Sequence, residues 1–197
     1  MRKFAGAIKF FTRLKEVKVL VTGPTGAGKT TLIHAIDERA KSVNAPSGAT
    51  IFMDVGIIIY DLKTGRYTSY VPPEASGEPD RFLKIKFIGT PGHERFRHQR
   101  LIVLSTSAKE VDVVALVVDS GDERSIEASK KILKEVSEKV RFKVLLLVAN
   151  KQDLPNALPG AEIAKRLGIQ EYVETSALYR RGVDDFIRKC AELSKFT

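Results

Sequence analysis

The stretch that decides the fold of this chain is G-P-T-G-A-G-K-T, at residues 23–30. It follows an apolar run at residues 17–22 and opens a segment that we predict to be helical at residues 30–41. The spacing fits the P-loop pattern, in which a glycine-rich turn joins a strand to a helix and surrounds phosphate oxygens with backbone N–H groups. The helix N-terminus adds its positive end. We therefore predict a phosphate-binding loop; the alternative is a glycine-rich turn with a purely structural role.

Three side chains of this loop have a predicted role in the P-loop pattern. Lys29 can reach the β- and γ-phosphates, the hydroxyl of Thr30 can ligate magnesium, and Thr31 is placed to donate to the α-phosphate. The other predicted phosphate contacts come from the loop itself, at Gly23, Thr25, Gly26, Ala27 and Gly28.

Apolar runs alternate with longer periodic stretches along the rest of the chain. Residues 113–118 and 144–148 are almost wholly aliphatic, which is typical of central parallel strands covered on both faces. The other predicted elements are strands at residues 57–61, 83–87 and 172–174, a hairpin arm at 66–71, and helices at 125–139, 161–167 and 183–196. This alternation predicts an α/β fold with a doubly wound, mostly parallel six-stranded sheet flanked by helices and one antiparallel edge strand. Ligands of such sheets bind at the C-terminal ends of the strands.

Two short motifs follow predicted strands and point to a guanine base. They are N-K-Q-D at residues 150–153 and S-A-L at residues 176–178. A carboxylate at Asp153 can accept from both N1–H and N2–H₂ of guanine, and adenine offers neither donor in that arrangement. The other predicted contacts are Asn150 linking the base pocket to the phosphate loop, the stem of Lys151 over the base, the Ala177 N–H donating to O6, and Ser176 and Leu178 in the same loop. Either motif alone could be a polar turn, but their order after a P-loop favours base recognition.

Composition and charge set further limits. The single cysteine, Cys190, excludes an intrachain disulfide and indicates a reducing, cytoplasmic location. No apolar run in the sequence is long enough to cross a bilayer. The formal net charge is +9, and residues 1–18 hold six basic residues against one acidic residue. We predict a basic N-terminal segment at residues 1–15 and one P-loop domain at residues 16–197.

With Thr50 before a strand and G-T-P-G-H-E-R-F at residues 89–96, these motifs resemble the Ras-like superfamily of small GTPases over about residues 17–195. The stretch N-K-Q-D-L-P looks Arf-like. The stretches T-I-F-M-D-V-G and G-T-P-G look more like a prokaryotic branch, the predicted GTPases related to the signal-recognition-particle receptor β-subunit, with the bacterial polarity GTPases a near neighbour. The resemblance implies a P-loop GTPase fold that binds GTP or GDP with Mg²⁺, hydrolyses GTP slowly without an activator, and switches partner binding.

The resemblance also implies the switch residues. Thr50 would be the first-switch threonine that ligates magnesium, and the N–H of Gly92 would bond the γ-phosphate. Most of the superfamily has an aspartate near magnesium at the place of Gly89, and Asp54 is a candidate substitute.

His93 stands where Ras-like proteins have the glutamine that positions water. The sequence Pro-Gly-His at this place is similar to that of the translational GTPases. A neutral imidazole can accept from a water molecule, and an imidazolium can stabilise charge at the γ-phosphate. We predict His93 as the catalytic residue; the alternative is a solvated switch residue, with hydrolysis left to an outside group.

The N-terminal segment reads as a basic amphipathic helix, with Phe4, Ala7, Ile8, Phe11 and Leu14 at helical spacing. Arf-like proteins use such a helix on membranes, so peripheral membrane contact is one hypothesis, and packing on the domain or on a partner protein is the other. Residue 2 is Arg, which excludes N-myristoylation.

Several functions fit these motifs to different degrees. The first is a switch GTPase that meets an effector or activator through its switch regions, with Arg95, Arg97 and Arg100 as a partner-binding face. The alternative is a GTP-binding assembly or scaffold module with negligible hydrolysis, which the missing aspartate at residue 89 favours. A small-molecule kinase is disfavoured by the guanine motifs. Nucleic acid is not an expected partner, because no RNA-binding pattern is visible.

Overall fold

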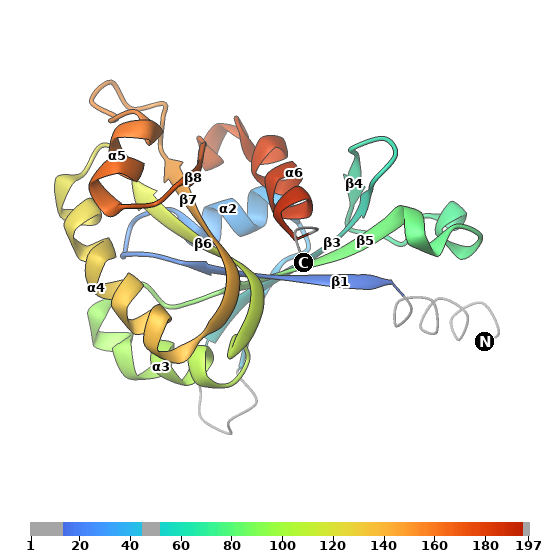
Figure 1. The fold of residues 1–197 in the computed structure, drawn as a ribbon, viewed down its shortest axis with the longest axis horizontal. Helices are drawn as coiled ribbons and strands as arrows, with labels where there is room; N and C mark the ends of the chain where they lie inside the picture. The colour runs from blue at the N-terminus through green and yellow to red at the C-terminus, as the bar shows by residue number, and fades with distance from the viewer. Residues whose placement is uncertain (1–13, 45–51, 195–197) are drawn as a thin grey trace.

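The computed structural model describes residues 14–44 and 52–194 (Figure 1). Within these residues, one eight-stranded sheet runs through the molecule in the order β2-β3-β5-β1-β6-β7-β8, and β4 pairs with β3. The strands are β1 (Lys15–Thr22), β2 (Lys41–Asn44), β3 (Phe52–Asp61), β4 (Tyr67–Thr68), β5 (Phe82–Gly89), β6 (Glu110–Asp119), β7 (Arg141–Asn150) and β8 (Glu171–Glu174).

The sheet has a parallel part and an antiparallel part. Strands β5, β1, β6, β7 and β8 are mutually parallel, and β3 runs antiparallel to β5, β2 and β4. The predicted α/β fold with a mostly parallel sheet is confirmed. The sheet has eight strands instead of the predicted six, because β2 was not expected and the predicted hairpin arm, β4, also pairs with β3; the antiparallel part is therefore larger than one edge strand.

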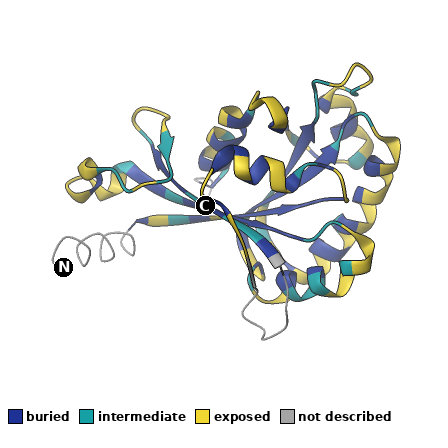
Figure 2. Ribbon diagram, turned by 180° about the vertical axis from the view of Figure 1, so that it is seen from behind, coloured by how far each residue is buried: buried dark blue, intermediate teal, exposed yellow. Residues whose placement is uncertain are grey.

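Helices cover both faces of the sheet. They are α2 (Lys29–Ile36), α3 (Arg97–Ser105), α4 (Glu123–Lys139), α5 (Gly160–Leu167) and α6 (Val183–Leu193). One apolar core joins the sheet to α2 and α6, and a second joins the other face to α4, α5 and the end of α3. Figure 2 shows the central strands buried between these layers, with the exposed residues on the outer sides of the helices.

The first helix ends five residues before its predicted end. Asp37, directly after α2, is extended, with φ −133° and ψ 104°. Its carboxylate accepts from the backbone N–H groups of Arg39 and Ile57 and from the hydroxyl of Ser69. These bonds turn the chain toward β2, so residues 37–40 of the predicted helix form a turn and its last residue, Lys41, begins a strand.

Helix α3 has no counterpart in the sequence prediction. Its first half is polar, with Arg97, His98, Gln99 and Arg100, and only its second half is apolar. It is held against the sheet by Val103 and Leu104, which are fully buried. The predicted hairpin arm is also shorter than expected, since only the two residues of β4 pair with β3.

The chain between β4 and β5 carries two short 3-10 turns, η1 (Pro73–Ser76) and η2 (Pro79–Arg81). Together with the outer parts of β3 and β5, this region extends away from the helical layers (Figure 1). It is fixed by the ion pair of Arg81 with Asp61, whose hydrogen bonds hold the pKa of Asp61 well below its usual value.

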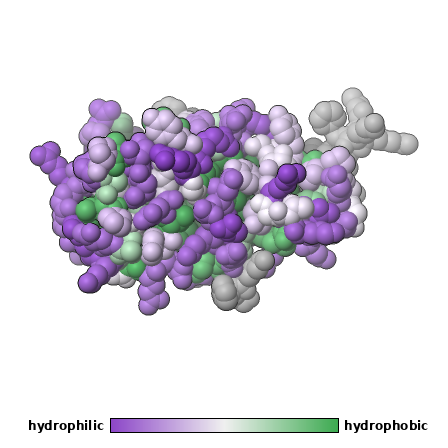
Figure 3. All heavy atoms as spheres, turned by 90° about the horizontal axis from the view of Figure 1, so that it is seen from above, coloured by the Kyte–Doolittle hydropathy of each residue, from purple (hydrophilic) through white to green (hydrophobic). Residues whose placement is uncertain are grey.

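The surface is largely polar. Hydrophilic side chains dominate the face drawn in Figure 3, and the hydrophobic ones lie in small scattered groups. Of the helices in the described ranges, none has the length and apolar character needed to cross a bilayer.

Candidate functional site

Residues 23–28 join β1 to α2 in a loop whose conformation requires glycine at two positions. Gly23 and Gly28 have φ values of 144° and 94°, in the region that L side chains rarely adopt. A Cβ on Gly23 would lie 2.1 Å from the carbonyl oxygen of Val117, and a Cβ on Gly28 would lie 2.3 Å from Nδ2 of Asn150. The loop is therefore packed tightly against the ends of β6 and β7, at the C-terminal edge of the parallel strands.

Lys29, the first residue of α2, is almost completely buried in this loop. Its ammonium group donates to the carbonyl oxygen of Pro24 at 2.6 Å. The pKa of Lys29 is lowered to about 8, mainly by burial and also by the positive charge of Arg100, while the charge of Asp54 opposes the shift. An anion placed here would relieve the cost of a buried cation, so the site is electrostatically suited to phosphate.

The hydroxyl of Thr30 is paired with a carboxylate from the neighbouring sheet region. Thr30 Oγ1 donates to Asp54 Oδ2 at 2.6 Å, and Ser42 Oγ donates to Asp54 Oδ1 at 2.6 Å. Asp54 comes from β3, and its backbone lies beside Gly89 at the end of β5: a Cβ on Gly89 would lie 3.1 Å from the Asp54 Cβ. Thr50, the other predicted magnesium ligand, lies outside the described residues.

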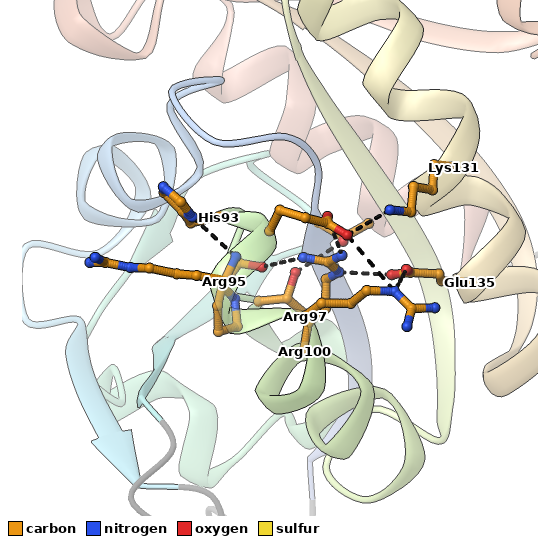
Figure 4. A network of polar contacts seen from close by, with 10 residues as sticks. His93, Arg95, Arg97, Arg100, Lys131 and Glu135 are labelled. Atoms are coloured by element: carbon orange, nitrogen blue, oxygen red, sulfur yellow. Dashed lines mark hydrogen bonds and ion pairs between the residues drawn. The ribbon is translucent and has the colours of Figure 1, made fainter.

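Gly92, the predicted switch glycine, lies directly over the P-loop. A Cβ at this residue would be 2.3 Å from Lys29 Nζ and 2.8 Å from the carbonyl oxygen of Pro24. No residue larger than glycine would therefore fit here without moving the loop. The next residue, His93, is exposed, and its Nδ1 accepts from the backbone N–H of Arg95 at 3.2 Å (Figure 4).

These segments enclose a pocket of about 740 Å³. It is lined by the P-loop, by Asp54, and by the segment predicted to be the second switch, Gly89 to His93, with Phe96 and Gln99. Among the predicted phosphate-site residues, Thr25, Gly26, Gly28, Lys29, Thr30, Thr31, Gly92 and His93 line it. Gln99 was not singled out from the sequence, because its place on the pocket follows from α3, which the sequence did not predict.

The two predicted base motifs are also brought together. Asn150 donates from Nδ2 to the carbonyl oxygen of Ala27 at 2.8 Å, which is the expected link to the phosphate loop. Its Oδ1 accepts from the Ala177 N–H at 3.0 Å and from Thr175 Oγ1 at 3.0 Å. Asp153 accepts from the hydroxyl of Ser176. The Ala177 N–H is thus already engaged, so the predicted bond to guanine O6 requires this donor to be shared or exchanged.

Two residues that hold the base motifs in place are not predicted from the sequence. Asp119, the last residue of β6, accepts from Lys151 Nζ at 2.6 Å and so fixes the lysine stem predicted to cover the base. Thr175 holds Asn150. Both follow strands that were predicted, so their position at the C-terminal edge of the sheet was the available signal. Leu178 is 70% exposed at this edge.

One predicted surface residue is not on the surface. The sequence predicts a partner-binding face formed by Arg95, Arg97 and Arg100, but the side chain of Arg100 is completely buried. It bonds to Glu135 of α4 and to the carbonyl oxygen of Pro91. The prediction of an exposed Arg100 is therefore wrong, because α4 supplies a buried carboxylate for it.

The strand order, the loop after β1 and the motifs after β5, β7 and β8 together define the G domain of the Ras-like small GTPase superfamily. A family model confirms this placement and makes it more specific. The model of the ADP-ribosylation factor (Arf) family matches residues 81–192, more than half of the chain. The chain belongs to the ADP-ribosylation factor family.

Individual proteins agree with this placement. The ADP-ribosylation factor-like protein 13B of Chlamydomonas reinhardtii is 29% identical over 157 residues, which cover 79% of this chain and 25% of that protein. The chain therefore spans about a quarter of the length of this relative.

Two solved structures share the fold. The G domain of the T. maritima FeoB iron transporter superposes with a TM-score of 0.64 and 23% identity, over 91% of this chain and 99% of that one. The cytosolic domain of the same transporter in its apo form superposes with a TM-score of 0.65 and 22% identity, over 92% of this chain and 65% of that one. At these identities the likeness concerns the fold alone.

Proposed function

We propose that this chain binds GTP and GDP with Mg²⁺, hydrolyses GTP slowly, and uses the difference between the two nucleotide states to control a protein partner. The observation that carries the proposal is the contact of Asp54 with Thr30 at the mouth of the phosphate pocket. It supplies a carboxylate in place of the aspartate that the family pattern has at residue 89, where this chain has glycine.

The residues present fit a magnesium ion that is held jointly with nucleotide. Magnesium prefers oxygen ligands and is commonly bound by one or two carboxylates together with substrate phosphates. Thr30 and Asp54 provide a hydroxyl and a carboxylate 2.6 Å apart, and Thr50 is the further ligand we propose. In residues 14–44 and 52–194, no group of three or more His, Cys, Asp or Glu residues could hold a metal by itself. The ion would therefore depend on the phosphates.

The chain's own residues would act mainly by positioning and by electrostatics. Magnesium, when bound, would offset charge on the phosphate oxygens. Lys29 would exchange its bond to Pro24 for phosphate oxygens, and the N–H groups of the P-loop and of Gly92 would point at the same anion. Asp153 and Asn150 would select and anchor the guanine base.

The hydrogen bond of His93 favours one of its two conceivable roles. Because Nδ1 accepts from the Arg95 N–H, the proton of a neutral His93 ring lies on Nε2. Nε2 is then a donor and cannot take a proton from the attacking water. We therefore propose that His93 stabilises charge at the γ-phosphate, as a donor, rather than serving as a general base.

Single-turnover hydrolysis of GTP by the purified chain tests this role. We expect His93→Ala to slow the step by about 10²-fold, the usual loss when one donor to a transition state is removed. His93→Gln, which keeps a donor, should retain part of the rate. Tight GTP binding with no hydrolysis by the unaltered chain would instead support a GTP-binding assembly module or a required activator.

Other parts of the proposal concern the N-terminal segment, of which residues 1–13 lie outside the described residues, and the location of the protein. Peripheral membrane contact through residues 1–15 remains a proposal, as does a cytoplasmic location. Pelleting with anionic liposomes, with and without these residues, tests the first, because loss of the basic segment should remove the binding.

A further inference from the structure

Arg100 is the largest fully buried side chain among the described residues, and the proposed chemistry does not use it. Removing a guanidinium from water costs several kcal/mol unless the group is well paired. Such a cost at the beginning of a short helix, beside a nucleotide pocket, calls for a reason.

The bonds of Arg100 connect three segments. Its Nε donates to Glu135 Oε2 at 2.9 Å, its Nη1 donates to the carbonyl oxygen of Pro91 at 3.2 Å, and its Nη2 lies 3.5 Å from Glu94 Oε2. Figure 4 shows Arg100 and Arg97 both directed toward Glu135 on α4. Arg100 therefore ties the second-switch segment to α4.

Glu135 is a suitable anchor for this contact. It is 4% exposed, and it accepts from Arg97 as well as from Arg100. Burial by itself raises the pKa of Glu135, but the hydrogen bonds from Arg100 and Arg97 hold that pKa below its usual value. The carboxylate thus stays charged and holds the guanidinium in one orientation.

The contact with Pro91 fixes the direction of a neighbouring donor. The carbonyl of Pro91 and the N–H of Gly92 belong to one planar peptide unit, and in a trans peptide they point in opposite directions. The described residues contain no cis peptide bond. Holding the carbonyl toward Arg100 therefore aims the Gly92 N–H away from Arg100.

The phosphate pocket is lined by the loop and not by the guanidinium that holds it. Pro91 and Gly92 line the pocket, whereas Arg100 does not. Gly92 also sits over Lys29, the residue expected to reach the terminal phosphate. An N–H of Gly92 that points away from Arg100 is therefore free to face the pocket that Gly92 lines.

We propose that Arg100, anchored by Glu135, is a positioning residue that orients the Gly92 N–H for the third phosphate and so favours GTP over GDP. This inference rests on the proposed function, in which Gly92 contacts the γ-phosphate. It assigns the discrimination between the two nucleotides to a buried ion pair outside the pocket, and it couples that discrimination to α4.

The test compares the dissociation constants of GDP and of a slowly hydrolysed GTP analogue, measured with Mg²⁺ by calorimetry on the full chain. Arg100→Lys keeps the charge, but a single ammonium cannot span Glu135 and Pro91 as the guanidinium fork does. We expect the GTP-analogue affinity to fall about tenfold, the effect of one charge-assisted hydrogen bond, with GDP affinity unchanged. Glu135→Gln keeps the shape and an acceptor oxygen, and should shift the ratio in the same direction.

Arg97→Lys is the matched control, because Arg97 contacts the same Glu135 but has no bond to Pro91. Its nucleotide ratio should equal that of the unaltered chain. Equal losses for both nucleotides in Arg100→Lys and Glu135→Gln would show a general structural role and overturn the inference, as would unchanged ratios in folded variants. If the unaltered chain bound neither nucleotide, the proposed function would fail first and the inference with it.

Discussion

Asp54 of β3 lies against Gly89 of β5, and the Cβ that any larger residue would place at 89 would come within 3.1 Å of the Asp54 Cβ. The same Cβ would lie 2.7 Å from Cδ1 of Ile33. The carboxylate of Asp54 therefore reaches Thr30 from β3, and Gly89 leaves the space that the Asp54 side chain occupies. The glycine in place of an aspartate at residue 89 and the carboxylate of Asp54 are therefore structurally linked, because the first leaves space for the second.

The first prediction concerns this carboxylate. Asp54→Asn keeps an acceptor for Thr30 and Ser42 but removes the charge. We expect it to raise the Mg²⁺ concentration needed for half-maximal GTP hydrolysis by at least about tenfold, since magnesium relies on few protein ligands here. Turnover measured across a magnesium titration checks this. An unchanged magnesium requirement would contradict a role for Asp54 in binding magnesium.

A second prediction follows from the lowered pKa of Lys29. With a pKa of about 8, Lys29 is mostly neutral at pH 9, and bound phosphate favours its charged form. Nucleotide binding at pH 9 should therefore take up most of a proton, whereas binding at pH 6.5 should take up almost none at this lysine. GTP affinity should decline as the pH rises above 8.

Calorimetry in buffers of different ionisation enthalpy measures this proton uptake directly. A binding enthalpy at pH 9 that did not depend on the buffer would contradict the buried, lowered lysine. The same data at pH 6.5 serve as the internal control.

The close approach of Gly28 to Asn150 gives a third prediction. Gly28→Ala would force a methyl group to within 2.3 Å of Asn150 Nδ2 at a φ of 94°, and so break the link to Ala27. We expect the free energy of unfolding to fall by about 2–4 kcal/mol and nucleotide binding to be lost. Gly168→Ala is the matched control, because that glycine has a φ of 68° with no atom within 4 Å of the added Cβ. It should cost only about 1 kcal/mol. Urea denaturation measures the unfolding free energy of both variants, and equal losses of stability would contradict the clash at Gly28.

The base motif supports a fourth prediction. Asp153→Asn replaces a carboxylate acceptor with an amide, which should lower GTP affinity by about 10²-fold or more, because the guanine donors lose their partner. Asp184→Asn, in the first turn of α6 where the carboxylate accepts from Tyr67, should have no effect. Equilibrium binding of a fluorescent guanine nucleotide measures both. Comparable affinities for the two variants would argue against base recognition by Asp153.

The parts of the fold that could be predicted are those with local signals. The P-loop and the aliphatic strands have short-range patterns, and they were placed correctly to within a few residues. Helix α3 and strand β2 lack such patterns: α3 begins with polar residues, and β2 depends on the bonds of Asp37 to residues far along the chain.

The site shows the same division. The motif residues of the phosphate loop and of the base pocket could be named from spacing, because each follows a recognisable strand. The burial of Arg100 could not, since a charged residue is expected at the surface until Glu135 of α4 is seen to cover it. Likewise, the contact of Asp54 with Thr30 requires the antiparallel register of β3 and β5.

The most direct test of the central claim is hydrolysis of GTP and ATP by the purified chain, at equal concentrations, with and without Mg²⁺. We predict slow, magnesium-dependent hydrolysis of GTP and no detectable hydrolysis of ATP. Equal use of the two nucleotides, or hydrolysis that did not require magnesium, would contradict the assignment of the base motif and of the site around Thr30 and Asp54.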